Sequence, residues 1–254
     1  GHQRYNKQLC GIAGIIAPGP EKLVRIQRML TALRHRGPDD DGTAHDASAV
    51  LGFRRLSIID LAGGHQPLTN ADRSVWLVCN GEIYNHQELR GPLEAGGYRF
   101  QTHSDCEVII ALYERYGDRL LEHVRGMFAF GLWDTRRRRF LAARDHLGQK
   151  PLYYTQTGHG FAFASEIKAL LGFDPALRRM NLAALDQYLT LRLVAPPLSM
   201  FAGVHKLPPG HLLVKEDGRE PVVRPYWDLS YQPKLDGSEE SLIDQLEEKL
   251  EETL

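Results

Sequence analysis

The hydrophobic positions of the chain follow helical spacing in some segments and form short strand-like runs in others. Apolar residues recur at three- and four-residue steps between Leu23 and Leu33, which predicts an amphipathic helix. Segments 108–113 and 120–124 are also predicted to be helical. By contrast, 74–79 is mostly apolar and predicts a buried strand that stops at the Asn-Gly pair of 80–81.

Two further pairs of apolar runs predict β-hairpins. The runs 127–133 and 140–143 flank a charged turn, and the runs 152–154 and 161–163 flank a turn that contains glycine. Consecutive hairpins imply antiparallel sheet. Two such sheets need their outer faces covered, and the predicted helices can cover them. We therefore expect a layered α+β fold.

The pattern becomes loop-like near 207–210 and again near 232–237, and one amphipathic helix follows between Leu242 and Leu254. Its apolar stripe requires a packing partner. Two interpretations remain open: the helix begins a second domain, or it docks on the core of the preceding domain.

Composition narrows the class of protein. The chain has 254 residues, 43% of them hydrophobic and 25% charged, with a formal net charge of -1. These values suit one large domain, or one domain plus a linker, and give no reason to expect nucleic acid or an anionic membrane as partner. The Arg136–Arg139 run is predicted to be a solvated hairpin turn. No apolar stretch approaches about 18 residues and no signal-peptide core is present, so a cytoplasmic location is predicted.

Three cysteines lie at 10, 79 and 106. Their odd number and the lack of a CxxC pair disfavour a disulfide framework and a thiolate zinc site, so no metal site is predicted. Cys79 and Cys106 are expected to be small buried residues. Cys10 is the candidate for a working thiol.

The position of Cys10 decides whether it can act as a nucleophile with its own base. A cysteine at the start of a protein carries an α-amine with a pKa of about 7.7–8.0, which can accept the proton of the thiol. While Leu9 remains attached, the same nitrogen is an amide without useful basicity. Activity at Cys10 is therefore expected to require removal of Gly1–Leu9.

Polar residues near predicted strands form a candidate site for a small molecule. The Asn80 side chain and the Gly81 N–H can stabilise one developing oxyanion, although an Asn-Gly pair alone favours a tight turn. Arg55 stands in an otherwise apolar run and can clamp a carboxylate; the alternative is an exposed strand charge paired with Asp60 or another acid. Asp105 can hold an ammonium group, or alternatively cap a helix. Together, Arg55 and Asp105 complement an α-amino acid.

Ten segments, in this order along the chain, carry a resemblance to a known family: CGIAGI, RHRGPDD, RLSIIDLAGGHQP, NGEIYNHQELR, HSDCEVI, GMFAF, ARDHLGQKPLYY, ASEIKAL, LPPGH and YWDL. The chain resembles the glutaminase domain of asparagine synthetase B-type amidotransferases, which belong to the class II, N-terminal-nucleophile group. The similarity runs from Cys10 to about Asp228. It implies a four-layer αββα sandwich.

The resemblance also implies roles for individual residues. Cys10 would be the nucleophile, its freed α-amine the base, and Asn80 with Gly81 the oxyanion hole. The remaining implied residues bind the substrate glutamine or shape its pocket. Arg55 would bind the α-carboxylate, Asp105 with Glu82 the α-ammonium, while Leu56, Ser57, Ile58 and Ile59 would line the pocket and His35, Arg36 and Gly37 would shape or close it.

The implied activity is hydrolysis of L-glutamine to glutamate and ammonia through a cysteinyl thioester, with ammonia passed to an ATP-dependent synthetase domain. We expect residues 1–9 to be a tag remnant or propeptide, 10–228 the class II glutaminase domain, and 229–254 a linker and the first helix of a truncated synthetase domain. No Ser-Gly-Gly pyrophosphate loop precedes Leu254, so no cofactor is expected in this domain, and ATP and Mg only in the synthetase domain. A homodimer is compatible with the sequence. The alternative function is a catalytically silent module, with Cys10 blocked, that acts in docking or regulation.

Overall fold

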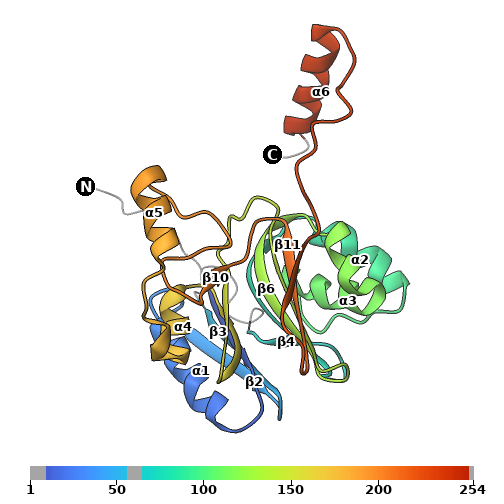
Figure 1. The fold of residues 1–254 in the computed structure, drawn as a ribbon. Helices are drawn as coiled ribbons and strands as arrows, with labels where there is room; N and C mark the ends of the chain where they lie inside the picture. The colour runs from blue at the N-terminus through green and yellow to red at the C-terminus, as the bar shows by residue number, and fades with distance from the viewer. Residues whose placement is uncertain (1–9, 56–64, 252–254) are drawn as a thin grey trace, which may run out of the picture.

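Two six-stranded antiparallel sheets stack face to face at the centre of the protein, and helices cover the outer face of each (Figure 1). The computed structural model describes residues 10–55 and 65–251. The arrangement is a four-layer αββα sandwich, as the resemblance implied.

The first sheet has the strand order β10-β8-β9-β1-β3-β2. Helices α1 and α4 pack together on its outer face, and the apolar stripe predicted between Leu23 and Leu33 buries Ile26, Met29 and Leu30 there. The elements of this half are β1 (Gly11–Ile16), α1 (Glu21–Ala32), β2 (Asp40–His45), β3 (Ala49–Arg55), β8 (Tyr153–Thr157), β9 (Gly160–Ala164), α4 (Ile167–Phe173), η3 (Pro175–Leu177), α5 (Leu182–Leu191) and β10 (His205–Lys206).

The second sheet has the order β12-β11-β7-β6-β5-β4. Helices α2 and α3 cover its outer face. The elements of this half are β4 (Leu68–Thr69), β5 (Val75–Ile83), α2 (His86–Ala95), η1 (Asp105–Glu107), α3 (Val108–Tyr116), η2 (Gly117–Glu122), β6 (Gly126–Asp134), β7 (Arg139–Arg144), β11 (His211–Glu216) and β12 (Val222–Pro225).

The layer between the two sheets is built around one phenyl ring. A Cβ atom at Gly14 of β1 would lie 2.3 Å from Phe163 Cε1, and one at Gly131 of β6 would lie 2.5 Å from Phe163 Cζ. Both distances are far below van der Waals contact, so only glycine fits on either side of the ring. Phe163 is fully buried in the apolar cluster between the sheets. Because Gly14 and Gly131 carry no side chain, the two sheets can approach closely at β1 and β6.

The predicted hairpins are confirmed as β6–β7 and β8–β9, and they lie in different sheets. Two boundaries were predicted wrongly. The strand at 74–79 does not stop at Asn80 but continues to Ile83, because pairing with β6 runs on through Glu82 and Met127. The segment predicted to be helical at 120–124 is helical only to Glu122, where the 3₁₀ helix η2 ends.

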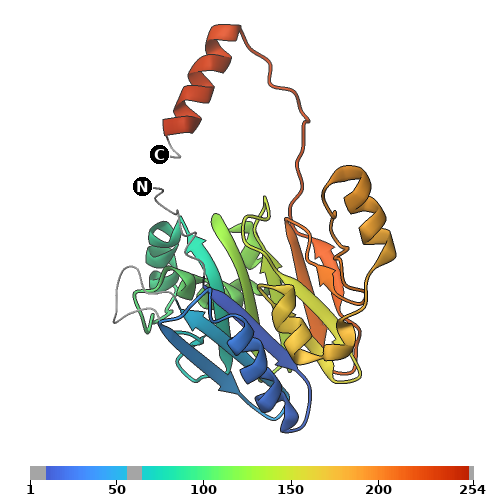
Figure 2. The same cartoon turned by 90° about the vertical axis from the view of Figure 1, so that its left-hand side faces the viewer.

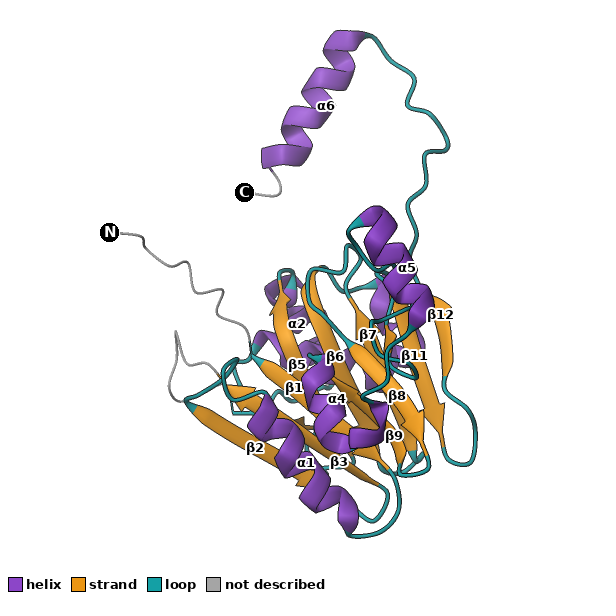
Figure 3. Ribbon diagram, turned by 60° about the vertical axis from the view of Figure 1, so that its left-hand side comes forward, coloured by secondary structure: helices purple, strands orange, loops and turns teal. Residues whose placement is uncertain are grey.

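The C-terminal helix α6 (Glu239–Glu251) has no buried residues, and Figures 2 and 3 show it beyond an extended segment. The interpretation that it docks on the core is therefore wrong for the described residues. The division into 10–228 and 229–254 stays a prediction. None of the helices within 10–55 and 65–251 is long and apolar enough to cross a bilayer.

Substituting Gly14→Ala is expected to lower the free energy of unfolding by about 1–3 kcal/mol, because the added methyl group overpacks Phe163 and Leu51. Urea denaturation measures this difference. Gly91→Ala is the matched control: Gly91 lies in α2 with no atom within 4 Å of the added Cβ, so helix propensity predicts a gain of about 0.5–1 kcal/mol. Equal stability of the two variants would contradict the packing argument.

Candidate active site

Cys10 directly precedes β1 at the edge of the layer between the sheets. It is half-buried and packs against the apolar cluster of that layer. The guanidinium of Arg36 donates a hydrogen bond from Nε to the Cys10 carbonyl oxygen at 3.0 Å. The backbone of the candidate nucleophile is thus anchored by a charged donor, which fixes where its side chain begins.

The loop that carries Arg36 is tied to the start of α4. Arg36 Nη1 donates to Glu166 Oε1 at 2.8 Å, and His35 Nε2 lies 3.0 Å from the same oxygen. Partial burial raises the pKa of Glu166, but the hydrogen bonds from Arg36, His35 and Lys168 outweigh this effect and hold its pKa below the ordinary value. At Gly37, a Cβ would lie 2.4 Å from the Arg54 carbonyl carbon. The loop therefore lies directly against β3, where it can shape a pocket beside Cys10.

Asn80 and Gly81 lie within β5, not in a turn. Asn80 is only 2% exposed, and its Nδ2 is buried without a hydrogen-bond partner among the described residues. Gly81 has φ of +152°, and a Cβ there would lie 2.0 Å from the Met127 carbonyl oxygen. The tight-turn interpretation is wrong, because β6 pairs with both residues. A buried donor without an acceptor costs about 1–3 kcal/mol, so its presence points to an acceptor supplied by a ligand.

Asp105 lies at the start of η1 and reaches back to the end of β5. Its Oδ2 accepts a hydrogen bond from the Ile83 backbone N–H at 2.7 Å. No side-chain hydrogen bond caps η1, so the helix-cap interpretation is wrong. The contact places Asp105 beside Ile83, the residue that follows Glu82. The Glu82 side chain is exposed. Both carboxylates thus belong to the same end of β5.

Arg55 ends β3 and is buried, with 9% of its surface exposed. The interpretation as an exposed strand charge is therefore wrong, and Asp60 lies outside the described residues. Arg55 pairs in register with Asp40 of β2. A hydrogen bond from His65 and, to a smaller extent, the charge of Arg55 hold the pKa of Asp40 below its ordinary value. Also outside the described residues are Gly1–Leu9 and the predicted pocket residues Leu56, Ser57, Ile58 and Ile59.

The fold brings the strands with the predicted residues together. Gly11 pairs with Arg54, so Cys10 and Arg55 belong to the same end of neighbouring strands. Both strands, β1 and β3, contact β5 across the sandwich, and β5 carries Asn80 and Gly81. One region of the interface between the sheets therefore holds the candidate nucleophile, the candidate carboxylate-binding residue and the candidate oxyanion donors.

Two buried charged residues at the end of β7, Arg144 and Asp145, were not predicted to have a role. Asp145 is fully buried, and its carboxylate accepts hydrogen bonds from the backbone N–H groups of Leu147, Gln149 and Lys150. Arg144 donates to the carbonyl oxygens of Gly148, Lys150 and Leu207. Together they fix the segment 145–150, which we call the Asp145 loop. The signal in the sequence was a charged pair directly after a buried strand.

Gln66 forms hydrogen bonds to β5, the strand that carries Asn80 and Gly81. Its amide accepts a hydrogen bond from the Cys79 N–H at 2.7 Å and donates one to the Cys79 carbonyl oxygen at 3.2 Å. Cys79 and Cys106 are buried, as predicted. A hydrogen bond with Cys79, together with burial, raises the pKa of the Cys106 thiol, so Cys106 is not a reactive thiolate.

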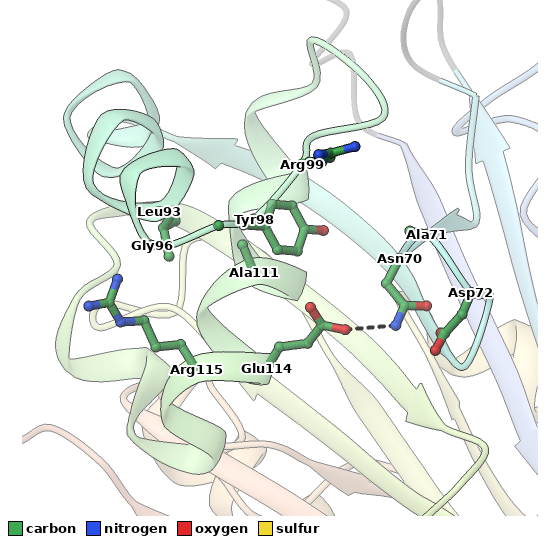
Figure 4. Close-up of a pocket in the computed structure, with 11 residues that line it drawn as sticks. Asn70, Ala71, Asp72, Leu93, Gly96, Tyr98, Arg99, Ala111, Glu114 and Arg115 are labelled. Atoms are coloured by element: carbon green, nitrogen blue, oxygen red, sulfur yellow. Dashed lines mark hydrogen bonds between the residues drawn. The ribbon is translucent and has the colours of Figure 1, made fainter.

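A separate pocket of about 630 Å³ opens between α2, α3 and the β4–β5 turn (Figure 4). Glu114 accepts a hydrogen bond from Asn70 at 2.7 Å across its floor. None of the predicted site residues that the structure describes lines this pocket. Its lining residues are Asn70, Ala71, Asp72, Leu93, Gly96, Gly97, Tyr98, Arg99, Ala111, Glu114 and Arg115.

A sequence profile described as the glutamine amidotransferase domain matches residues 9–227. The chain belongs to this family. The resemblance drawn from the ten segments is confirmed, because asparagine synthetase [glutamine-hydrolyzing] 1 of Bacillus subtilis is 38% identical over 248 residues. The match covers 95% of this chain and 39% of that relative. Amidase chyE of Penicillium rubens is 39% identical, with 90% of this chain and 34% of the relative covered.

Two solved enzyme structures share the fold. The glutamine phosphoribosylpyrophosphate amidotransferase of Bacillus subtilis, complexed with ADP and GMP, superimposes with a TM-score of 0.65 at 20% identity, covering 87% of this chain and 50% of that chain. A structure described as the allosteric regulatory enzyme of purine biosynthesis gives a TM-score of 0.66 at 22% identity, with the same coverage. This glutamine amidotransferase domain thus shares its αββα sandwich with both solved structures.

Asp105→Ala is expected to lower the free energy of unfolding by about 1–3 kcal/mol, because the Ile83 N–H loses its acceptor. Asp105→Asn retains an oxygen acceptor and is expected to lose less than half as much. Urea denaturation of both variants separates the hydrogen bond from the charge. Wild-type stability of Asp105→Ala would show that the bond to Ile83 does not hold β5 and η1 together.

Proposed function

We propose that this domain hydrolyses L-glutamine to glutamate and ammonia through a thioester on Cys10. The observation that carries the proposal is the buried Asn80 Nδ2, which has no acceptor among the described residues and lies on a strand that contacts β1. A tetrahedral intermediate at the amide carbon of glutamine would supply the missing acceptor, and donors fixed in advance stabilise such charge without reorganisation.

The proposed reaction has two steps: the thioester forms first, and water then hydrolyses it. The Cys10 thiolate attacks the side-chain amide carbon, and the oxyanion is held by Asn80 Nδ2 and the Gly81 N–H. The α-amine of Cys10, once Gly1–Leu9 are removed, takes the thiol proton and gives it to the departing ammonia. Water activated by the same amine then hydrolyses the thioester and releases glutamate.

Recognition of free glutamine is assigned to charged residues at the edges of the same region. Arg55 binds the α-carboxylate through its planar guanidinium, while Asp105 and the neighbouring Glu82 bind the α-ammonium. The pocket is completed by Leu56, Ser57, Ile58 and Ile59. The burial of Arg55 supports this assignment, because desolvation strengthens a pairing with a ligand carboxylate.

The ammonia is proposed to serve an ATP-dependent synthetase domain. The chain spans 39% of the length of its Bacillus subtilis relative, which is named an asparagine synthetase. This domain is proposed to use no cofactor, with ATP and Mg bound elsewhere in the longer protein. The silent-module alternative is not favoured, since relatives are named glutamine-hydrolyzing. A cytoplasmic location, a homodimer and the lack of nucleic-acid partners stay predictions.

A diazoketone analogue of glutamine is expected to label Cys10 in protein processed to begin at that residue. Intact-mass and peptide mass spectrometry would locate the adduct. The unprocessed chain, in which Leu9 blocks the α-amine, is the control and is expected to label far more slowly. The proposal is falsified if the processed chain, with its new N-terminus verified, gains no adduct on Cys10.

Asn80→Ala in the processed chain is expected to lower kcat for glutamine by a factor on the order of 10²–10³ while KM changes little, because the lost donor acts mainly on the oxyanion. Its stability should not fall below wild type, since the removed amide nitrogen was unpaired. The matched control is Asn181→Ala, which removes the cap of α5. It should lose about 1 kcal/mol of stability with kcat unchanged. Full activity of Asn80→Ala would remove the oxyanion assignment.

A further inference from the structure

Cys10 stands just before β1, which begins at Gly11. Once Gly1–Leu9 are removed, Cys10 is the first residue of the chain, and terminal residues are poorly ordered unless other groups hold them. A nucleophile must keep a fixed position, because a misplacement of about 1 Å can cost about 10²-fold in rate. Contacts beyond strand pairing are therefore expected at this end of β1.

The two residues that follow β9 provide such contacts. Ser165 is fully buried, and its Oγ accepts a hydrogen bond from the Ile12 N–H at 3.0 Å. The Ser165 N–H in turn donates to the Ile12 carbonyl oxygen at 2.9 Å. Ser165 thus extends the pairing between β1 and β9 beyond the end of β9. The next residue is Glu166, and α4 begins immediately after it.

Arg36 links Glu166 to Cys10. Its guanidinium donates from Nη1 to Glu166 Oε1 at 2.8 Å and from Nε to the Cys10 carbonyl oxygen at 3.0 Å. The Arg36 side chain is only 8% exposed, and among the described residues Glu166 is the acid that forms an ion pair with it. Its Nη2 is buried without a hydrogen-bond partner there. Because a buried charge depends on its charged partner, loss of the carboxylate would leave Arg36 free to turn away from Cys10.

His35 and Lys168 contact the same carboxylate from the more exposed side. His35 Nε2 lies 3.0 Å from Glu166 Oε1, and the Lys168 ammonium lies 3.1 Å from Oε2. The side chains of His35 and Lys168 are about half exposed, whereas that of Glu166 is 25% exposed. Exposed ion pairs contribute little. The partly buried pair of Arg36 and Glu166 is therefore the part of this network that bears on Cys10.

We propose that Glu166 is a positioning residue, which holds Cys10 in place for attack by orienting Arg36 against the Cys10 carbonyl. The inference rests on the proposed function, because it concerns the nucleophile assigned there. The described side-chain hydrogen bonds and ion pairs of Glu166 are with His35, Arg36 and Lys168. Glu166 thus acts on Cys10 through Arg36.

The test compares variants of the processed chain. Glu166→Ala and Glu166→Ser remove the acceptor of Arg36, whereas Glu166→Gln keeps one acceptor oxygen. Asp118→Ala is the matched control, because Asp118 also pairs with two cations, Arg139 and Arg224, and its side chain is 22% exposed. These two arginines belong to β7 and β12 of the second sheet.

In Glu166→Ala and Glu166→Ser, kcat for glutamine is expected to fall about 10- to 100-fold, because the nucleophile is less well positioned. KM should stay within about twofold, since the described side-chain contacts of Glu166 include none of the residues assigned to bind glutamine. Glu166→Gln and Asp118→Ala should keep kcat within about threefold of wild type, because both retain a hydrogen bond from Arg36 at position 166.

Amide hydrogen exchange, followed by NMR, measures order at the start of β1 without glutamine. The Ile12 N–H is expected to exchange about three- to tenfold faster in Glu166→Ala and Glu166→Ser than in wild type, because this end of the strand opens locally. Glu166→Gln and Asp118→Ala should keep the wild-type rate. The Ala17 N–H, which donates to the Ser48 carbonyl just beyond the other end of β1, should be unchanged in every variant.

The proposal is overturned if either kcat or Ile12 exchange is unchanged in folded Glu166→Ala. An equal rise in exchange at Ala17 would show a general loss of stability and would also overturn it, as would an equal loss of kcat in Glu166→Gln. If both truncations fail to fold while Glu166→Gln folds, the carboxylate serves the fold and the proposal fails.

Failure of the proposed function is distinguishable from these results. It would appear in the processed wild-type chain, as absent labelling of Cys10 by the diazoketone. Failure of the positioning role would appear only in the comparison between the Glu166 variants and wild type.

Discussion

The close approach of the two sheets along β1 and β6 is the constraint on which the rest of the structure depends. Glycine at 14 and 131 leaves space for the ring of Phe163 and nothing larger. The separation of the sheets at this point sets how near the start of β1, with Cys10, lies to β5, with Asn80. A sheet can form its hydrogen-bond ladder at any spacing, so the site depends on packing between sheets more than on pairing within them.

Hydrophobic periodicity predicted most of the architecture, because the antiparallel hairpins and the helix at 21–32 each bury a face that local sequence encodes. It failed where tertiary pairing overrides local preference. The Asn-Gly pair of β5 favours a turn by itself, yet β6 supplies partners on through Ile83 and keeps the strand extended. The η2 segment is a similar case, since its apolar residues, Leu120 and Leu121, are buried in a tighter helix than their spacing indicated.

The candidate site was predictable in part. Arg55, Asn80 and Asp105 interrupt or follow apolar runs, and such placement indicates that a polar residue has a functional or structural role. Glu166 gave no comparable signal. Glu166 acquires its significance from Arg36, 130 residues away in the chain, and sequence separation of that size carries no information about contact. Arg144 and Asp145 were visible as a charged pair, but a charged pair after a strand equally suits a solvated turn.

The amide of Gln66 occupies both backbone groups of Cys79, as a neighbouring strand would. Strand β4 is only two residues long, so its backbone pairs with only part of β5. The Gln66 side chain extends this ladder of hydrogen bonds to Cys79. Sheet borders with unoccupied N–H and C=O groups invite foreign chains to add themselves, which leads to aggregation. By occupying this border with a single side chain, the protein protects the strand that carries Asn80 and Gly81 from being captured by another molecule.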